Sequence, residues 1–486
     1  MRKQVERIVS VLMLSVIIII SIYRVSEFLQ LKDSNNRYAS FFSEKNQIDV
    51  IFLGSSHVRN AIFPMELWNN YGITSYNLAG NGNTIPVSYW ILVNALDYQT
   101  PKVVVMDVFD MWPGRKISTL WEQLHVALNA FPLSIHKYQA MQDLIDDENM
   151  LDGDDIPVYD KRWELLFDLG EYHTRWSSLG EEDFDNKSKL ESNSAIWKGA
   201  EPTSAVVPRD EHIYVENDNL YYDEIAKDYL VRMIELCANK NIDLLLINTG
   251  YDCSDEAKCF ADSVNEIAGQ YKISYIDFTE LDIISFESDL YTSGHNTHVN
   301  FSGGEKITSF IGQRLSTQYQ LSDYRDDKKY ESWWSDYQRF VNDKADYLRQ
   351  QSSLDSYLMF LADDDYHIII ELLDNSIINE ENNAAMFKNL GIDIDKFNEN
   401  NLLALDMTKK EVSYFSNNYV SGSKWVSVLG EISLWSDVDG KQGDEGTYGM
   451  YLNSQEVYVA SINGSAKIRI AVINRDSGEV EDIRVF

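Results

Sequence analysis

The stretch IDVIFLGSSHVRN, residues 48–60, decides the expected fold. Its first six residues are mostly apolar, and β-branched and aromatic residues of this kind favour a buried strand. Gly54 permits a sharp turn, and Ser55 and Ser56 stand where that turn ends and helical spacing begins. This order places a serine hydroxyl at the carboxyl end of a sheet strand, where open α/β sheets bind ligands.

Four apolar runs have the composition of buried parallel strands. Helical segments precede several of them, and this alternation predicts a doubly wound, mostly parallel α/β sheet. The irregular residues 113–220, rich in Trp, Tyr and Asp, are expected to form a long insertion over the carboxyl ends of the strands. The four runs are DVIFL (49–53), VVVMDV (103–108), DLLLIN (243–248) and ISYIDF (273–278).

The chain changes character after about residue 320. We expect an α/β domain over residues 31–320, and a helical connector over residues 321–365 because its apolar residues recur at helical spacing. Short strand-like runs separated by turn signals then predict a β-rich domain, a β-sandwich, over residues 366–486.

The composition excludes some classes of partner. The 486 residues include 77 acidic and 42 basic side chains, a net charge of −35. Nucleic acid is not an expected partner, because phosphate binding needs a basic surface. The three cysteines, Cys237, Cys253 and Cys259, form no zinc or redox motif. A local bridge between the last two is conceivable in an oxidising compartment, but unpaired thiols are the expectation.

The first 30 residues predict a membrane anchor. Arg2, Lys3 and Arg7 precede an uncharged run from Ile8 to Tyr23, and no small-residue cleavage site follows it. The run approaches the ~17–25 residues of a membrane span. We therefore expect an uncleaved, single-pass signal anchor at the cell membrane, with the basic end inside and the bulk of the chain extracytoplasmic. A cleaved signal peptide is the alternative, with the same outside location.

A serine nucleophile needs a base, which is most often histidine. The most suggestive histidines are His295 and His298, in SGHNTHVNFSGGEKIT (293–308), which follows the last apolar run and leads into a helical segment. We expect them on a loop at the same sheet edge as Ser56. Because 242 residues separate Ser56 from His298, the two can meet only through the fold.

These motifs resemble those of the SGNH/GDSL hydrolases. Residues 54–56 match the Gly-Asp-Ser block of that family, with a serine in the place of the aspartate. The resemblance implies that Ser56 is the nucleophile and His298 the base. It also implies that the backbone N–H groups of Ser56 and Gly82 hold the oxyanion, with Gly80 close enough to compete with Gly82.

The chain more closely resembles the membrane-anchored branch of that superfamily, which includes proteins of lipoteichoic acid D-alanylation and exopolysaccharide O-acetylation. The features that carry the resemblance lie in residues 40–315 and include FLGSSHV, SYNLAGNGNTIPVSYW and HVNFSGGEKIT. Two features depart from the pattern: position 295 is histidine where the family has the triad aspartate, and the Gly-x-Asn-Asp block is missing. Asp289, Asp107 or Asp110 can supply the acid, or a Ser–His dyad can act alone.

The resemblance implies acyl transfer through an acyl-serine, as an esterase or an O-acyltransferase, on a cell-envelope or exported polysaccharide such as a teichoic acid-like glycan. A membrane acyltransferase is a further expected partner, and no metal or cofactor is expected. The alternative is a catalytically inactive scaffold that binds polysaccharide or that membrane partner.

Two further segments bear on binding. GEYHTRW contains His173, Arg175 and Trp176, which can bind an anionic group and stack on a sugar, or can form an ordinary wall of the insertion. The last 125 or so residues contain YHIIIELLDNSIINEENNAAMFKNLGI (366–392) and VYVASINGSAKIRIAVINRDSGEVEDIRVF (457–486). With these segments they resemble the interleukin-like EMT-inducer domain, related to sugar-binding stem domains of glycosyltransferases. This resemblance implies a carbohydrate-binding β-sandwich; a structural or partner-docking module is the alternative.

Overall fold

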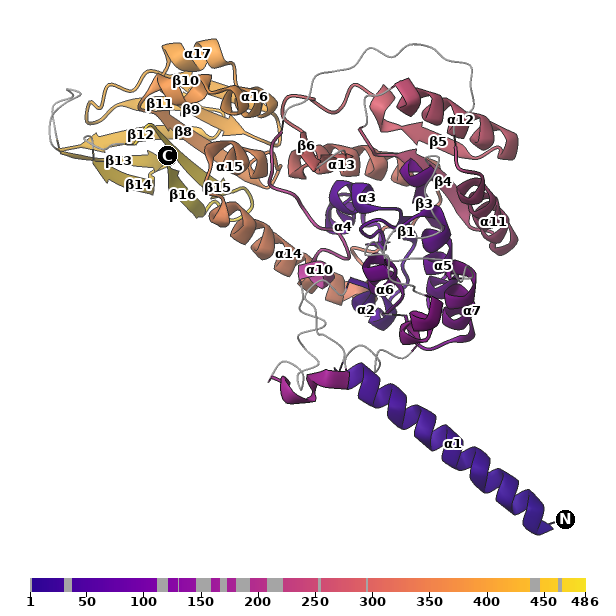
Figure 1. The fold of residues 1–486 in the computed structure, drawn as a ribbon. Helices are drawn as coiled ribbons and strands as arrows, with labels where there is room; N and C mark the ends of the chain where they lie inside the picture. Colours follow the sequence, from indigo (N-terminus) through magenta and orange to yellow (C-terminus); the bar gives the residue numbers. More distant parts are fainter. Residues whose placement is uncertain are drawn as a thin grey trace. The chain divides into compact units, whose positions relative to one another are not determined.

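The chain forms two compact units (Figure 1). Unit 1 comprises Met1–Glu201, His212–Leu281 and Ile307–Phe340, and unit 2 comprises Pro202–Glu211, Asp282–Lys306 and Val341–Phe486. The computed structural model describes residues 2–29, 37–111, 121–129, 131–145, 159–166, 173–180, 193–207, 222–251, 255–293, 296–437, 446–461 and 466–486.

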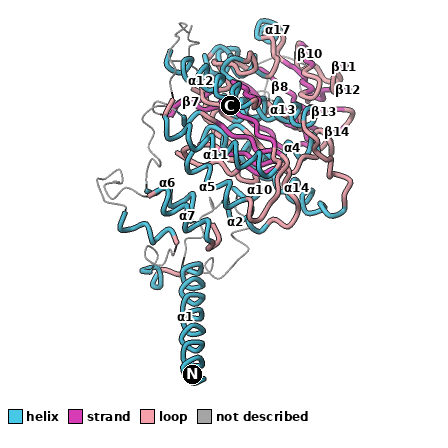
Figure 2. The backbone as a smooth tube through the Cα atoms, turned by 90° about the vertical axis from the view of Figure 1, so that its right-hand side faces the viewer, coloured by secondary structure: helices cyan, strands magenta, loops and turns pink. Residues whose placement is uncertain are grey.

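Unit 1 is built on a five-stranded parallel sheet in the order β2-β1-β3-β4-β5, drawn in magenta in Figure 2. All residues of β1 and β3 are buried, as continuous apolar runs in parallel sheets require. The expectation of a parallel α/β sheet is therefore confirmed. The strands are β1 (Val50–Leu53), β2 (Ser75–Asn77), β3 (Val103–Asp107), β4 (Asp243–Asn248) and β5 (Ser274–Asp277).

Helices connect the strands of this sheet, and further helices follow its last strand in the sequence. Two of them, α13 and α14, have residues in both units. The helices are α2 (Arg37–Ser43), α3 (Ser56–Ala61), α4 (Pro64–Tyr71), α5 (Ile85–Ala95), η1 (Phe109–Met111), α6 (Trp121–Asn129), α7 (Ile135–Leu144), η2 (Tyr159–Leu165), η3 (His173–Ser177), α10 (Asn193–Ile196), α11 (Glu224–Lys240), α12 (Asp255–Tyr271), η5 (Phe278–Glu280), α13 (Phe301–Gln318), η6 (Lys328–Tyr330) and α14 (Glu331–Gln350).

The first helix, α1 (Arg2–Leu29), is long and apolar enough to span a membrane or to act as a signal anchor. Its apolar stretch, Lys3–Ser26, has a mean hydropathy of 2.5 over the most apolar window. That window is not buried against the rest of the chain, so it does not belong to a protein core.

Unit 2 contains two larger antiparallel sheets and a two-stranded hairpin. The first sheet has the order β10-β9-β8-β15-β16, and the second has the order β11-β12-β13-β14. The elements are β6 (Leu290–Ser293), β7 (Asn296–Val299), α15 (Leu354–Phe360), β8 (Tyr366–Leu372), η7 (Asn375–Asn379), α16 (Glu381–Asn389), α17 (Ile394–Glu399), β9 (Leu402–Asp406), β10 (Glu411–Phe415), β11 (Lys424–Ser427), β12 (Gly430–Ser436), β13 (Thr447–Leu452), β14 (Gln455–Ser461), β15 (Ile468–Asn474) and β16 (Val480–Val485).

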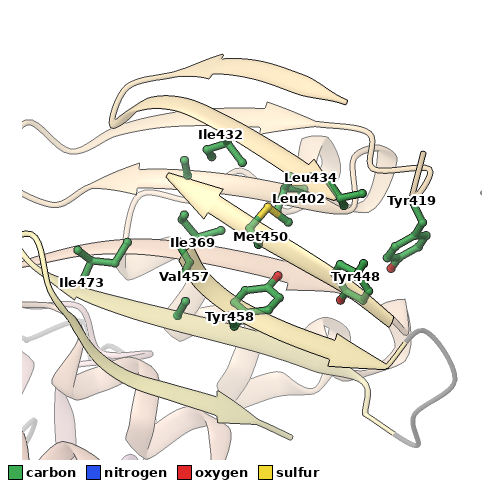
Figure 3. Packing of buried hydrophobic residues seen from close by; sticks show 12 residues of the cluster. Ile369, Leu402, Tyr419, Ile432, Leu434, Tyr448, Met450, Val457, Tyr458 and Ile473 are labelled. Atoms are coloured by element: carbon green, nitrogen blue, oxygen red, sulfur yellow. The ribbon is translucent and has the colours of Figure 1, made fainter. Parts of the chain in front are cut away.

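The two larger sheets share one hydrophobic core. Figure 3 shows Ile369 and Leu402 of the first sheet packed with Ile432 and Met450 of the second. Inward and outward residues alternate in the second sheet: in β12, Ile432 and Leu434 are buried whereas Trp435 is 49% exposed. This is the alternation of a sheet with one covered face.

A charged cluster is buried in the same core. Glu371 is fully buried, and its Oε2 accepts hydrogen bonds from Arg469 Nη1 at 2.6 Å, from the Tyr458 hydroxyl at 3.1 Å and from the Tyr448 hydroxyl. Its Oε1 accepts from Asn417 Nδ2 at 3.0 Å. Burial raises the pKa of both tyrosines, so their hydroxyls keep the protons that they donate.

The structure differs from the sequence-based expectations in two places. The segment expected as a loop around His298 forms the β6–β7 hairpin. In residues 366–486, the sequence indicates strands at YHIIIELL, WVSVLGEISLW, EVYVASI, AKIRIAVIN and IRVF, and these form β8, β11 with β12, β14, β15 and β16. The strands β2, β9, β10 and β13 were not predicted. The strand β2 is only three residues long. The sequence of β13, TYGMYL, has no β-branched residue after its first position.

Replacing Arg469 by methionine tests the buried cluster. Arg469→Met leaves the Glu371 carboxylate buried without its cation, and we expect the free energy of unfolding to fall by about 3–5 kcal/mol. The control is Lys424→Met, which removes an exposed pair with Glu431 (2.7 Å) and should cost about 0–1 kcal/mol. Chemical denaturation followed by circular dichroism measures both; equal costs would contradict the role given to the cluster.

Candidate active site

The turn after β1 is fixed by a residue that lacks a side chain. Gly54 has a φ of +143°, and a Cβ added there would lie 2.8 Å from the Cβ of Asp107 on β3. No other residue fits this position without a shift of the backbone. Ser55 follows in an extended conformation at the N-cap position of α3, and Ser56 is the first residue of that helix and half-buried. The Ser56 side chain therefore stands at the carboxyl end of β1.

The continuation of β2 brings the second glycine segment to this turn. The Leu78 N–H donates to the Phe52 carbonyl at 2.9 Å, and the Gly80 N–H donates to the Gly54 carbonyl at 3.0 Å. Gly82 follows two residues later with a φ of +61°, a conformation that favours glycine. The structure therefore brings the segments of Ser56 and Gly82 together at one edge of the sheet.

A buried carboxyl group lies behind the turn. Asp107, at the end of β3, accepts a hydrogen bond from the Thr249 hydroxyl at 2.7 Å and one from the Phe109 N–H at 3.1 Å. Burial, with a smaller contribution from Asp110, raises the pKa of Asp107 to about 7. The hydrogen bonds to Asp107 oppose this effect. A fraction of Asp107 is thus protonated at neutral pH, and Thr249 is a partner that sequence reasoning missed.

A histidine next to the candidate nucleophile supports the turn. His57 is 2% exposed, and its Nδ1 lies 3.1 Å from the Ser55 Oγ. Its ring packs on Phe109 at a centroid distance of 4.0 Å. A Cβ added at Gly250 would lie 2.0 Å from the Phe109 ring, so Phe109 is wedged between His57 and the backbone after β4. These contacts hold the carboxyl ends of β1, β3 and β4 in one packed layer.

The candidate base lies in the hairpin of unit 2. His298 is on β7, where it pairs with Tyr291 of β6, and it is 5% exposed. The two rings stack at a centroid distance of 5.4 Å and an angle of 29°. His295, the other histidine considered for this role, lies outside the described residues. A strand holds His298 more rigidly than the loop that the sequence predicted.

The candidate acid Asp289 joins the start of β6 to the start of α13. Its carboxylate accepts hydrogen bonds from the Ser285 N–H at 2.7 Å, from the Ser302 hydroxyl at 2.9 Å and from Lys306 Nζ at 2.5 Å. Its carbonyl accepts from the Asn300 N–H at 2.9 Å. Among the described residues, Asp289 thus bonds to the segments on both sides of the hairpin. Its proposed role as the acid for His298 stays a prediction.

The candidate residues are divided between the two units. Ser56 and Gly82 belong to unit 1, whereas His298 and Asp289 belong to unit 2. The meeting of Ser56 and His298 stays a prediction. Within each unit, the candidates of that unit lie on neighbouring segments.

The third candidate group lies beside the end of α1. Arg175, in η3, donates a hydrogen bond from Nη1 to the Leu29 carbonyl at 2.5 Å, and Leu29 is the last residue of α1. Trp176 is 56% exposed. The side chain of His173 lies outside the described part of the chain. Substrate binding by these residues stays a prediction.

Cys237 is not a competing nucleophile. Cys237 is a buried free thiol, and burial raises its pKa to about 12. A thiol with so high a pKa is not ionised at neutral pH. Cys259 is also buried. Cys253 lies outside the described residues.

Proteins similar to this chain are found among solved structures. No protein-family model matches the chain, and no curated protein matches it. The crystal structure of a "putative acylhydrolase" from Bacteroides fragilis is similar at 11% sequence identity and a TM-score of 0.29, covering 57% of this chain and 94% of that one.

The contact between Gly54 and Asp107 gives the first prediction for this site. Gly54→Ala should lower the free energy of unfolding by about 1–3 kcal/mol, because the backbone must leave its conformation or the strands must part. Gly269→Ala, in α12 with no atom within 4 Å of the added Cβ, should be neutral or stabilising by about 0.5–1 kcal/mol. Chemical denaturation compares the two variants, and a neutral Gly54→Ala would refute the constraint.

The raised pKa of Asp107 gives the second prediction. The folded protein binds this proton more tightly than the unfolded chain does, so its contribution to stability falls as pH rises from about 4, the ordinary aspartate pKa, to about 7. Asp107→Asn has no such proton. The free energy of unfolding of the wild type minus that of Asp107→Asn should therefore decrease over this range and then level off. Denaturation at a series of pH values measures it, with the exposed Asp476→Asn as control; a constant difference for Asp107→Asn would contradict the burial argument.

Proposed function

We propose that this chain is a membrane-anchored, extracytoplasmic acyl-transfer enzyme of the SGNH type. It acts as an O-acyltransferase or esterase on cell-envelope or exported polysaccharide. The observation that supports the proposal best is the turn after β1, where Gly54 packs against Asp107 and bonds to Gly80. This geometry holds Ser56 at the carboxyl edge of the sheet, near a second backbone segment that can offer N–H groups.

In the proposed mechanism, Ser56 Oγ attacks the carbonyl carbon of an ester while His298 takes its proton. The N–H groups of Ser56 and Gly82 hold the oxygen that becomes negative, and the loss of one such donor typically costs about 10²–10³ in rate. The carbon–oxygen bond of the ester then breaks, and the alkoxide leaves with the proton from His298. Water or a sugar hydroxyl attacks the acyl-serine in the second half of the reaction, again with His298 as base.

Asp289 is proposed to support the base by positioning it. Its hydrogen bonds to Ser302 and Lys306 hold the ends of the β6–β7 hairpin on which His298 lies. In this role, the carboxylate of Asp289 fixes the imidazole of His298 indirectly, because it holds the backbone of the hairpin in place. Ser56 is then activated by His298 alone, as a Ser–His pair.

The alternative is an inactive scaffold that binds polysaccharide or a membrane acyltransferase. The contacts of Asp289 favour it, because Lys306 lies 2.5 Å from the carboxylate that would otherwise orient the base. Without an acid, a triad histidine loses most of its catalytic effect. The two candidates differ in one property: only the enzyme has a reactive serine.

A fluorophosphonate probe distinguishes the two. The full-length protein in detergent or nanodiscs should react at Ser56, and peptide mass spectrometry should locate the adduct there. Ser56→Ala should abolish labelling and His298→Ala should slow it by about 10²-fold or more, because the serine then lacks its base. The exposed Ser335→Ala is the matched control and should label as the wild type does.

The inactive scaffold predicts the opposite labelling result. It would remain unlabelled at Ser56 and still bind glycan, and that result would overturn the enzyme proposal. Labelling that survives Ser56→Ala would also overturn it, because the reactive group would then lie elsewhere.

A further inference from the structure

We propose that unit 1 has a second contact with the lipid bilayer, formed by η3, η2 and the exposed apolar side of α6 and α7. The inference rests on the part of the proposed function in which α1 is a retained membrane anchor. It adds that the folded body lies on the membrane surface instead of hanging from a free tether. The partner is the interfacial layer of a phospholipid bilayer.

The hydrogen bond between Arg175 and Leu29 sets the depth of η3. The apolar stretch of α1 ends at Ser26, and Leu29 follows three residues later as the last residue of the helix. A stretch of 24 residues spans about 36 Å, a little more than the ~30 Å hydrocarbon layer. A residue bonded to the Leu29 carbonyl therefore lies at the level of the lipid headgroups.

The side chains of η3 and η2 suit that level. Each helix carries an arginine beside an exposed tryptophan: Arg175 beside Trp176, which is 56% exposed, and Arg162 beside Trp163, which is 48% exposed. Tryptophan is enriched at membrane interfaces because one side of its ring is apolar and the other polar. Arginine binds phosphate through its N–H groups. In both of these arginines, Nη1 already donates to a backbone carbonyl, that of Leu29 for Arg175 and that of Tyr159 for Arg162. The charges differ between the two helices: η3 has an arginine and no acidic residue, whereas in η2 the acidic Asp160 and Glu164 balance the basic Lys161 and Arg162.

The neighbouring helices extend this surface with apolar side chains. In and just before α7, Leu133, Ile135 and Tyr138 are 40%, 64% and 40% exposed, and Val126 of α6 is 56% exposed. The Tyr138 ring lies 6.2 Å from the ring of Trp163, so α7 and η2 form one surface. Exposed apolar side chains that gather in one place indicate a contact with another surface.

The two views of unit 1 show where α6 and α7 lie relative to α1. Figures 1 and 2 both show α6 and α7 at the end of unit 1 from which α1 projects, and η3 contacts α1. Contacts join η3 to α1, and others join η2 to α6 and α7. A bilayer that holds α1 meets this side of the unit first.

Brominated lipids test the proposal on the full-length chain. The first tryptophan in the sequence is Trp68, so α1 contributes no tryptophan fluorescence and any quenching by bromine reports the folded body. In nanodiscs of phosphatidylcholine and phosphatidylglycerol, dibrominated phosphatidylcholine should quench a fraction of the emission. Trp176→Phe and Trp163→Phe should each lower that fraction, and the double variant should lower it by about half or more. Trp435→Phe, which removes a tryptophan of similar exposure from β12, should not lower it.

Each other outcome counts against the proposal. If the protein co-elutes with nanodiscs but both variants are quenched as the wild type is, the anchor holds and the second contact does not exist. If Trp176 and Trp163 are protected from acrylamide by added polysaccharide and not by lipid, they bind glycan and the surface is not a lipid contact. If the chain does not co-elute, the anchor and this inference both fail. Fluorophosphonate labelling of Ser56 reports the enzyme proposal separately in the same sample.

Discussion

The close approach of β1 to β3 at Gly54 is the constraint on which the candidate site depends. The two strands pair in parallel with Leu53 beside Met106, and the next residues along each chain are Gly54 and Asp107. Because Gly54 has no Cβ, the chain can reverse over Asp107 and begin α3 at once. The carbonyl of the same glycine accepts the Gly80 N–H, so one residue sets both the serine turn and the path toward Gly82.

The two candidate acids lie in opposite electrostatic environments. Asp107 is buried with a hydroxyl and a backbone N–H as donors, and no cation is among the causes of its pKa shift. Asp289 is equally buried but has the Lys306 ammonium as a partner. Burial without a cation favours the protonated form of Asp107. Asp107 is thus suited to pack within the layer at the carboxyl ends of β1, β3 and β4. Asp289 is suited to connect chain segments through its ion pair with Lys306.

The sequence predicted those parts of the fold that depend on local composition. The strands β1, β3, β4 and β5 are apolar runs covered on both faces. Such runs can be recognised in a sequence without knowing which strands they pair with. The hairpin around His298 and the strand β2 are polar or short, and their conformation comes from pairing with distant segments.

The candidate site was predictable to a similar extent. The roles of Gly54 and Ser56 could be predicted from the strand and the turn, because a glycine between an apolar run and a helix start indicates a sharp turn. The pairing of Asp107 with Thr249 and the contacts of Asp289 with Lys306 join residues that no spacing rule connects. The burial that raises the pKa of Asp107 is likewise a property of the fold.

The segment around Trp176 shows why position decides function where composition cannot. A tryptophan beside an arginine suits a sugar with an anionic group, whose ring has an apolar face next to a charge. It equally suits a phospholipid, whose apolar acyl chains adjoin a charged phosphate. The sequence favours neither. The hydrogen bond from Arg175 to the last residue of α1 places this pair at the end of an apolar helix, and under the proposed membrane anchorage lipid lies within its reach.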